Sequence, residues 1–483
     1  MQYQTIFRVI GVLLMLFSVS MIPPFFIDAI YRDGAGNAFI LGFFATFGTG
    51  FLMWNRFRKF YQHLKTRDGF VVVVLFWMVL SLFGALPLYI AHHPFDSFTN
   101  AMFEAVSGLT TTGATVYSGI EFLPHAIQFY RQELQFLGGM GIIVLAVAVL
   151  PMLGIGGMQL YRAETPGPMK DSKLTPRITE TAKALWYIYL TLTLACALCY
   201  WLAGMNTFDA VSESFSTVST GGFSTHDASF GFYHSKSIDL IACFFMFLGG
   251  VNFALHFLVL QRHKLVSYWE DIEFRTYYYI VFTTSFIAIV VLWWTQQYPT
   301  FSEAIVHGLF TVISLITTTG LSSTSLGHWP MALIMTIYLI AIIGACGGST
   351  SGGVKVMRFI LLCKQSMREM RRLVHPKAVY SIKFGRQTLP EHTVEAMWGF
   401  IAIFIAVFVI VLLLLLASGL DMPSALTADV ATLANVGAGV GSVAHNFEHL
   451  TGFAKWVCIF AMLAGRLEIF TLLVLFTPAF WRR

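Results

Sequence analysis

Long apolar runs without charged residues alternate with short polar segments along the whole chain. A run of about 20 such residues is long enough to cross a bilayer as a helix, and ten runs approach or exceed that length. They cover residues 9–27, 38–54, 70–91, 137–160, 184–205, 240–260, 276–295, 331–354, 396–420 and 456–481, and only the last contains charges, at Arg466 and Glu468. The pattern predicts an all-α polytopic membrane protein.

A short polar phrase recurs four times, each time between two of these runs. Each copy begins with Ser or Ala, ends with Gly six positions later, and carries Ser, Thr or Asn between them. The copies are residues 107–113, 216–222, 314–320 and 431–437. A stretch too short to span precedes each copy, at residues 98–106, 208–215, 305–313 and 424–430. Such a stretch is typical of a half-helix that enters the membrane and stops.

The order span, half-helix, polar loop, span therefore repeats four times. We predict four pseudo-symmetric repeats around one pore, preceded by an N-terminal two-helix hairpin. The predicted boundaries are 1–67 for the hairpin and 68–161, 162–263, 264–386 and 387–483 for the repeats. One small, hydroxyl-rich stretch is more often a helix-packing seam, but four stretches in equivalent places favour a shared function.

Four polar loops that meet on one axis can surround a cation with backbone carbonyls, as in a selectivity filter. Glycine allows the backbone angles that turn successive carbonyls toward the axis, and each half-helix would direct its negative C-terminal end at the ion. The predicted ion-binding residues are Thr111, Thr112, Thr220, Gly221, Thr318, Thr319, Asn435 and Val436. The glycines predicted to close the site are Gly113, Gly222, Gly320 and Gly437.

A second glycine-rich stretch, residues 344–353, lies inside the run 331–354. Its five glycines disfavour a helix by about 1 kcal/mol each, so we predict that the helix breaks into an intramembrane loop below the filter and that this loop is a gate. The alternative is a tightly packed helix contact. The predicted gate residues in this stretch are Gly344, Gly347, Gly348, Ser349, Thr350, Ser351, Gly352 and Gly353.

Arg466 is a charged residue in the middle of the last apolar run. A charge at membrane depth is costly and is expected to face a bundle interior or water. We predict that Arg466 extends into the pore below the filter as part of the gate, the alternative being a structural salt bridge. Glu104 and Glu213, nine positions before the first two filter glycines, either concentrate cations near the filter or tie the half-helices to their neighbours.

Composition and charge agree with a membrane protein. The chain is 57% hydrophobic and 11% charged, against about 25% charged residues in soluble domains. Lys and Arg gather at residues 56–67, 162–183, 262–275, 355–386 and 482–483. The positive-inside rule places these segments and both termini in the cytoplasm. Topology therefore explains the net charge of +5, and no nucleic-acid partner is expected.

The four loops, the stretch Gly-Ser-Thr-Ser-Gly-Gly-Val-Lys at 348–355 and Gly465-Arg466-Leu467-Glu468 resemble the TrkH family. Its members are the membrane subunits of bacterial Trk potassium-uptake systems, in a superfamily with KtrB and the plant and fungal HKT/Trk transporters. Residues 32–36 and 373–380 are also similar to this family, and the resemblance covers nearly the whole chain.

The resemblance implies a K⁺-conducting protein in the bacterial inner membrane, in contact with the lipid bilayer. It implies K⁺ as the transported ion and no organic cofactor. It further implies a homodimer with one pore per subunit, docked on a cytosolic, nucleotide-binding TrkA-like ring that controls the gate. In HKT relatives, Ser in place of the first filter glycine favours Na⁺, so Gly113 implies a preference for K⁺.

Two other functions compete with a channel-like pore. A symporter that couples K⁺ to H⁺ or Na⁺ would need a titratable group in the pathway, and Arg466, Glu104 and Glu213 are the candidates. A membrane-embedded enzyme would need a clustered nucleophile and base or a metal motif such as HExxH, and the sequence contains no such motif. We therefore predict that the chain is not an enzyme.

Overall fold

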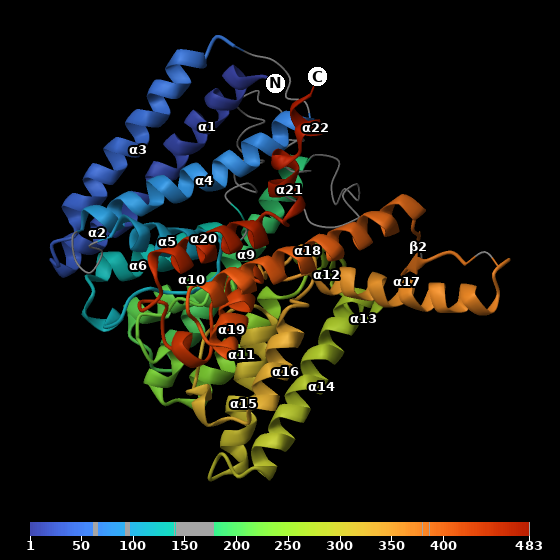
Figure 1. Ribbon diagram of the computed structural model, residues 1–483. Coiled ribbons are helices and arrows are strands. Elements are labelled where there is room, and N and C mark those ends of the chain that lie inside the picture. Colours follow the sequence, from blue (N-terminus) through green and yellow to red (C-terminus); the bar gives the residue numbers. More distant parts are fainter. Residues whose placement is uncertain are drawn as a thin grey trace.

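The computed structural model describes residues 1–60, 66–91, 97–139, 141, 178–378, 380–385 and 387–482. These residues form an almost entirely helical protein, in which short helices in the centre are surrounded by longer ones (Figure 1). Two-residue strands, β1 (Lys383–Phe384) and β2 (Gln387–Thr388), form a small antiparallel pair. The all-α prediction is therefore correct.

The N-terminal hairpin consists of α1 (Tyr3–Ser18), a 3-10 turn (Val19–Met21), α2 (Ile22–Tyr31) and α3 (Gly36–Phe57). Helices α1 and α3 lie side by side because each has a glycine at the crossing. A Cβ on Gly11 would lie 2.7 Å from the carbonyl oxygen of Gly50, and a Cβ on Gly50 would lie 2.7 Å from the carbonyl oxygen of Gly11. Small residues that let helix backbones approach are the usual basis of helix association in membranes.

Each predicted repeat opens with a long apolar helix. These helices are α4 (Thr66–Ile90), α9 (Ile178–Leu202), α14 (Ile272–Trp294) and α18 (Glu391–Ala417). Among the described residues, six helices are long and apolar enough to cross a membrane: these four, α3, and the α1–α2 segment taken as one span. Their outward faces expose large apolar side chains, such as Phe286 and Trp294, which suits contact with lipid.

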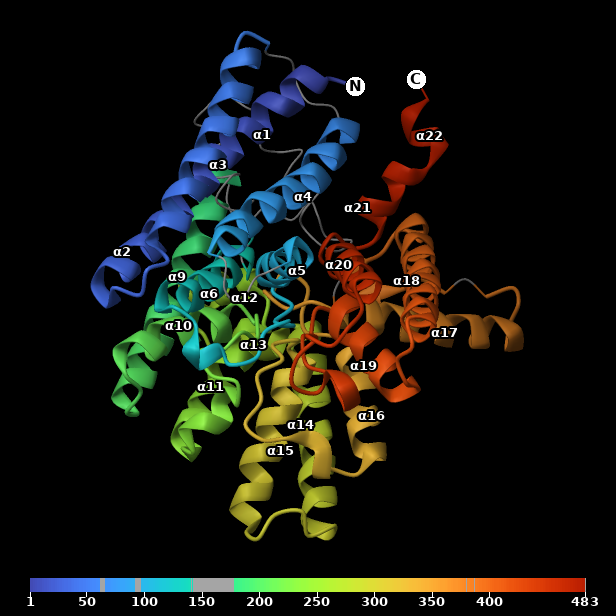
Figure 2. The same cartoon turned by 60° about the vertical axis from the view of Figure 1, so that its left-hand side comes forward.

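The predicted half-helices are present. They are α5 (Phe98–Leu109), α10 (Thr207–Val218), α15 (Phe301–Ile316) and α19 (Met422–Leu433). In Figure 2, α5 and α19 lie near the middle of the molecule and α15 lies lower, beside α14. At 12 to 16 residues, the half-helices are too short to span a bilayer, which needs about 20.

In the second and fourth repeats, the second apolar run does not form the single straight span that the sequence predicted. Residues 240–260 form α11 (Lys236–Gly249) and α12 (Phe253–Arg262), which meet at 93°. Residues 456–481 form α20 (Gly452–Arg466), then α21 (Phe470–Leu473) and a 3-10 turn (Val474–Phe476), bent by 106°. Counting each bent pair as one span gives up to eight spans among the described residues, against the ten predicted.

The third repeat also lacks a straight second span, and the first repeat is described only in part. In the third, α16 (Met331–Ala341) ends early and α17 (Val356–Val374) begins after a long loop. In the first, α6 (His125–Gly139) starts 12 residues before the predicted span, and most of the predicted run 137–160 lies outside the described residues. Most of the basic cluster at 162–183 also lies outside them.

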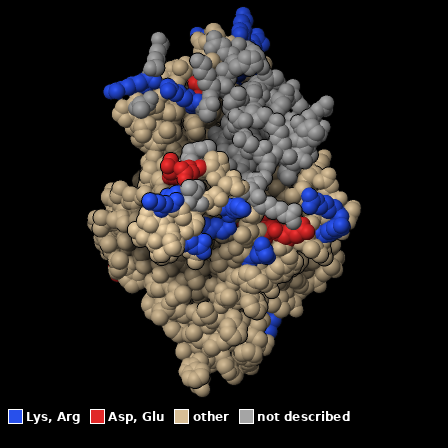
Figure 3. Space-filling view, turned by 90° about the vertical axis from the view of Figure 1, so that its right-hand side faces the viewer, with Lys and Arg blue, Asp and Glu red and all other residues tan. Residues whose placement is uncertain are grey.

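Shorter elements connect these helices. They are α13 (Val266–Glu270) and α22 (Pro478–Trp481), together with 3-10 turns at Ile120–Phe122, Ser229–Tyr233, Leu326–His328 and Gly441–Val443. The N- and C-termini lie at the same end of the molecule (Figure 1). Lys and Arg side chains gather toward that end in the view of Figure 3, and the opposite end is almost free of charge.

Glycines let the second helices lie close to the half-helices. Gly138 on α6, Gly249 on α11 and Gly465 on α20 each lie against the carbonyl oxygen of the last residue of the half-helix in their own repeat. Those carbonyls belong to Leu109, Val218 and Leu433. Any side chain would push the second helix away from the half-helix. Beyond the α20 glycine, Glu468 and Ile469 adopt positive φ angles of 55° and 50°, which end that helix.

We predict that Gly465→Ala destabilises the protein by about 1–3 kcal/mol, because the added Cβ overlaps the carbonyl of Leu433 in a packed core. The measurement is the thermal unfolding of purified protein in detergent. Gly48→Ala is the matched control: Gly48 is also helical but has nothing within 4 Å of its Cβ position, so alanine there is expected to be neutral or stabilising. Equal melting temperatures for the two variants would contradict the close-approach explanation.

Candidate ion-binding site

The four half-helices begin and end in the same way. A side-chain oxygen caps the start of each one by accepting a backbone N–H from two or three residues ahead, the usual way of satisfying the first helix donors. The capping residues are Ser97, Asn206, Thr300 and Asp421. The C-terminal end of each helix, which carries partial negative charge, leads directly into one of the polar phrases.

These phrases form four loops of the same backbone conformation, here called the ring loops: residues 110–113, 219–222, 317–320 and 434–437. The second residue of each has a positive φ of 52–56° and the closing glycine one of 79–90°. Those second residues are Thr111, Thr220, Thr318 and Asn435. A positive φ is uncommon for residues other than glycine, so four matching instances identify a shared, constrained structure.

The third residue of each ring loop is fixed by one backbone hydrogen bond. Its N–H donates to the carbonyl five residues earlier, at 2.8–2.9 Å in all four loops. The donors are Thr112, Gly221, Thr319 and Val436, and their acceptors are Ser107, Ser216, Ser314 and Ala431. The first residue of each copy of the phrase thus accepts this bond through its backbone carbonyl. A backbone acceptor does not depend on the side chain, which explains why the spacing recurs even where the residue types differ.

The ring loops meet one another in a closed cycle. A Cβ on Gly113 would overlap the carbonyl oxygen of Gly221 in the second loop. The same holds for Gly222 against Thr319 in the third loop, and for Gly320 against Val436 in the fourth. Gly437 closes the cycle against the carbonyl oxygen of Thr112 in the first loop. Each loop therefore presents the carbonyl before its glycine to the neighbouring loop, and only glycine fits at the contact.

The structure brings all eight predicted ion-binding residues together in this ring, buried from solvent. Several of their side chains bond to residues outside their own loop. Thr220 Oγ1 donates to Thr350 Oγ1 (3.1 Å), and Thr318 Oγ1 accepts from the N–H of Gly352 (2.6 Å). Asn435 Nδ2 links the fourth loop to the first by donating to Thr112 Oγ1 (2.8 Å).

The predicted break in the run 331–354 is present, because α16 ends at Ala341 and α17 begins at Val356. The segment between them, the inner loop (residues 342–355), lies against the ring loops from the side of α17. Gly344, Gly348 and Gly353 adopt φ angles of 72–77°. At its tip, Thr350 Oγ1 contacts the carbonyl oxygens of Val218 and Gly249, both at 3.1 Å.

Arg466 joins the first ring loop to the inner loop. Its guanidinium donates to Thr111 Oγ1 and to the carbonyl oxygen of Thr350, both at 3.2 Å. It also donates to the carbonyl oxygens of Gly138 and Gly139 at the end of α6. The neighbouring carboxylate, Glu468, pairs instead with Arg358 (2.6 Å). Arg466 is thus placed where the inner loop and the ring loops touch.

Glu104 and Glu213 bind the segments that follow the first and second ring loops. Glu104 is fully buried and accepts from Arg131 Nε (2.6 Å), from Thr115 Oγ1 (2.9 Å) and from the N–H of Val116 (3.2 Å). Thr115 and Val116 lie two and three residues after Gly113. Both carboxylates therefore tie the segment that leaves a ring loop to its half-helix, which is the second of the two roles considered from the sequence.

Glu213 makes the equivalent bonds in the second repeat, to Ser224 Oγ (2.6 Å) and to the N–H of Thr225 (2.9 Å).

Sequence reasoning missed two further residues on α6. Arg131, fully buried, also lies over the ring of Phe223, and Gln135 Nε2 donates to the carbonyl oxygen of Gly221 (2.7 Å). The unusual density of Gln, Arg and Glu at 128–135 in a chain this apolar was the available signal.

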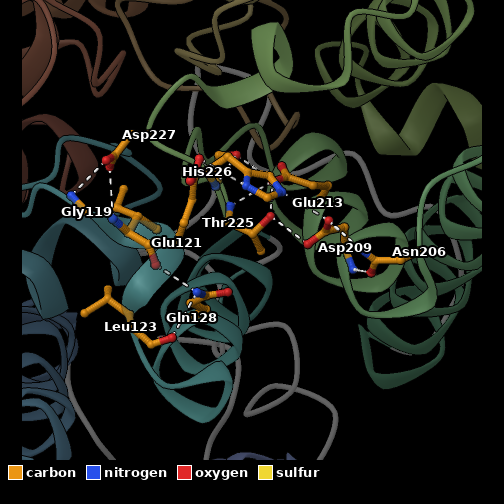
Figure 4. A network of polar contacts seen from close by, with 12 residues as sticks. Gly119, Glu121, Leu123, Gln128, Asn206, Asp209, Glu213, Thr225, His226 and Asp227 are labelled. Atoms are coloured by element: carbon orange, nitrogen blue, oxygen red, sulfur yellow. Dashed lines mark hydrogen bonds and ion pairs between the residues drawn. The ribbon is translucent and has the colours of Figure 1, made fainter.

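On the side away from the inner loop, a polar network joins the first and second repeats (Figure 4). His226 Nε2 lies 3.2 Å from Asp209 on α10, and its Nδ1 lies 3.4 Å from Glu121 in the first repeat. Its ring also stacks on Phe232. Next to it, the Asp227 carboxylate accepts the N–H groups of Gly119 (2.8 Å) and Ile120 (3.0 Å).

The charged groups around His226 determine the direction in which its pKa is shifted. Burial acts to lower the pKa of His226, but the hydrogen bond and charge of Asp209, with the charge of Glu213, outweigh it and raise the pKa above the ordinary 6.5. Glu121 acts in the same direction. The protonated imidazole is therefore the form that holds the two repeats together at this face.

The ring offers oxygen ligands, which suit hard cations. Among the described residues, no group of three or more His, Cys, Asp or Glu side chains is placed to hold a metal ion. The chemistry available at the ring is therefore the coordination of a weakly bound cation by carbonyl and hydroxyl oxygens.

Comparison with known proteins identifies the relatives of this arrangement. The family model of TrkH, described as a cation transport protein, matches residues 35–483. The chain is 52% identical over 482 residues to the Trk system potassium uptake protein TrkH of Escherichia coli (strain K12), covering 100% of both chains. Its identity to the protein of that name from Vibrio parahaemolyticus is also 52%, over 484 residues and 100% of both chains. A crystal structure of the potassium transporter TrkH from Vibrio parahaemolyticus matches with a TM-score of 0.91 and 49% identity, covering 100% of both chains.

We predict that His226 makes the stability of the protein depend on pH. Because the pKa of His226 is raised in the folded state, its stabilisation is complete below the unfolded pKa of about 6.5 and is lost as pH rises through the higher folded value. As pH rises above about 6.5, the melting temperature of the wild type is expected to fall more steeply than that of His226→Gln. His449→Gln, at an exposed histidine in another loop, is the control. Parallel pH curves for the wild type and His226→Gln would contradict the role of His226.

Proposed function

Because the chain belongs to the TrkH family of cation transport proteins, which are transporters and not enzymes, we propose that it takes up K⁺ across the bacterial inner membrane through a pore at the ring loops. The K⁺ ligands are the oxygens of the eight residues predicted from the sequence. Each ring loop contributes its second and third residues, and the four glycines let neighbouring loops approach closely.

The observation that carries this proposal is the closed cycle of four glycine–carbonyl contacts. Non-helical backbone at membrane depth is stable only where it is buried in protein or lines a wet cavity. In a ring of carbonyls, a cation and its waters serve as the partners that the surrounding hydrocarbon does not provide. The four half-helix C-termini add negative potential at the same point, which favours cations over anions.

The inner loop and Arg466 act as the gate. Gly352 and Thr350 touch three ring loops from the intracellular side, and the Arg466 guanidinium places a positive charge beside them. A cation leaving the ring toward the cytoplasm meets both obstacles, so transport requires the loop to move.

A passive, gated pore is favoured over symport with H⁺ or Na⁺. Coupling of K⁺ to H⁺ or Na⁺ would use the carboxylates Glu104 and Glu213. Both are hydrogen-bonded to the segments that follow the first two ring loops. The gathering of Lys and Arg toward the end that holds both termini supports a cytoplasmic location for that end (Figure 3).

A regulatory partner is proposed on this cytoplasmic side. Helix α17, which leaves the inner loop, carries the basic residues Lys364, Arg368, Arg371 and Arg372. We place the docking of a TrkA-like nucleotide-binding ring on this side and propose that the protein works as a homodimer with one pore in each subunit.

The first functional prediction concerns selectivity. Gly113→Ser is expected to lower the preference for K⁺ over Na⁺ by about tenfold, equivalent to ~1.4 kcal/mol, because a side chain at this position displaces the carbonyl of Gly221. The permeability ratio in reconstituted liposomes measures this change. Gly119→Ser is the matched control, since Gly119 also has a positive φ (70°) but lies outside the ring. An unchanged ratio for Gly113→Ser would remove this loop from the filter.

The second functional prediction concerns the gate. Deletion of residues 348–352 is expected to raise cation flux about tenfold, as is Arg466→Ala, because each removes an obstacle worth on the order of 1 kcal/mol or more. A fall in flux by correctly folded deletion protein would contradict the gate. If Arg466→Ala only lowers the melting temperature, Arg466 is a structural residue.

A further inference from the structure

Glu273, on the first turn of α14, holds the inner loop at its base. It is 5% exposed, and one of its oxygens, Oε1, accepts two backbone N–H groups. These donors are Gly347, at 2.7 Å, and Met357, at 3.0 Å. The first lies on the limb that enters the loop and the second lies just beyond the limb that leaves it, so one carboxylate oxygen joins the two ends.

The carboxylate also completes a helix that lacks a cap of its own. The N-cap residue of α17, Lys355, has a positive φ of 80°, and its side chain makes no capping hydrogen bond. The first N–H groups of a helix need acceptors, and negative charge is favoured near them. Glu273, which belongs to α14, supplies both the hydrogen-bond acceptor and the negative charge at the start of α17. The start of α17 therefore depends on the position of α14.

Other backbone hydrogen bonds hold the inner loop. Some run to the bend between α11 and α12, where Cys346 N–H donates to Gly250 and Phe253 N–H donates to Gly348, both at 3.0 Å, and others lie within the neck. Val354 N–H donates to Ile342 (3.0 Å), Lys355 N–H to Ile343 (2.7 Å) and Val356 N–H to Ala345 (3.0 Å). The bonds within the neck keep the two limbs together but do not fix them to a spanning helix. The bonds of Glu273 do, because α14 is a straight span of 23 residues.

We propose that Glu273 is the positioning residue of the gate, which latches the inner loop to α14 and thereby holds Thr350 and Gly352 beneath the ring. Both bonds share one oxygen, so α17 cannot move relative to α14 without weakening them. A displacement of α17 releases the latch and lets the loop leave the ring. This inference rests on the proposed gating function and assigns the residue on which it depends.

The test measures rubidium flux into liposomes for the wild type, Glu273→Ala, Glu273→Gln and the 348–352 deletion. The deletion is also combined with Glu273→Ala. Glu273→Ala is expected to raise flux about tenfold, because two hydrogen bonds to a charged group are lost. Glu273→Gln keeps an acceptor oxygen at the same place and is expected to restore most of the closed behaviour. In the deletion background, Glu273→Ala is expected to add nothing, since the tip that it positions is gone.

Asp271→Ala is the matched control. Asp271 lies two residues earlier and caps α14 by accepting the N–H of Phe274 (2.8 Å), so its removal weakens the same helix start without touching the loop. It is expected to leave flux at the wild-type level. Equal rises for Asp271→Ala and Glu273→Ala would assign the effect to general loosening and overturn the latch.

The remaining outcomes separate the latch from the gate. If the deletion raises flux and folded Glu273→Ala does not, the gate stands and the latch is wrong. If neither change raises flux, the proposed gate itself fails. Should Glu273→Ala not fold, Glu273→Gln decides, alone and combined with the deletion: a rise of less than tenfold over the wild type that adds nothing in the deletion background supports the latch, and a Glu273→Gln flux equal to that of the wild type contradicts it.

Discussion

The structure depends on four contacts in which a glycine of one ring loop lies against a backbone carbonyl of the next. These contacts leave no room for a Cβ, so they fix both the residue type and the separation of the four loops. The half-helices, their caps and the backbone bonds to Ser107, Ser216, Ser314 and Ala431 all bring the loops to this point. The helices outside the ring then serve to bury it, because irregular backbone is otherwise unstable at membrane depth.

The two sides of the ring are stabilised differently. On one side, short hydrogen bonds of the buried carboxylates Glu104 and Glu213, of Arg131 and of Gln135 hold the ring loops and the segments that follow them. On the inner side, the contacts are made by a glycine-rich loop and one arginine, and these bonds run mostly to side-chain hydroxyls and backbone oxygens. This difference between the two sides is consistent with the proposed pore and its internal gate, and Glu273 connects the inner loop to a spanning helix.

The sequence predicted the elements that depend on local spacing. The recurring phrase located the half-helices and all four ring loops, and the five glycines of 344–353 located the broken helix. Hydropathy did not predict the bends after Gly249 and Arg466, because an apolar run has the same composition whether it is straight or bent by about 100°. It also missed Arg131, 27 residues from its partner Glu104, and Glu273, 74 residues from Gly347. Such pairings are set by tertiary packing and leave no periodic signal.

The central claim is that the ring is a K⁺-selective passive pore. The most direct measurement is radioactive rubidium uptake by liposomes that contain purified protein, with K⁺, Na⁺ or Li⁺ as competitor and with or without a pH gradient. Including the variant that lacks residues 348–352 prevents a closed gate from limiting the signal. We expect uptake that K⁺ blocks, that Na⁺ and Li⁺ do not block, and that the pH gradient leaves unchanged. Uptake that requires the pH gradient, or that Na⁺ and Li⁺ block as well as K⁺ does, would contradict this claim.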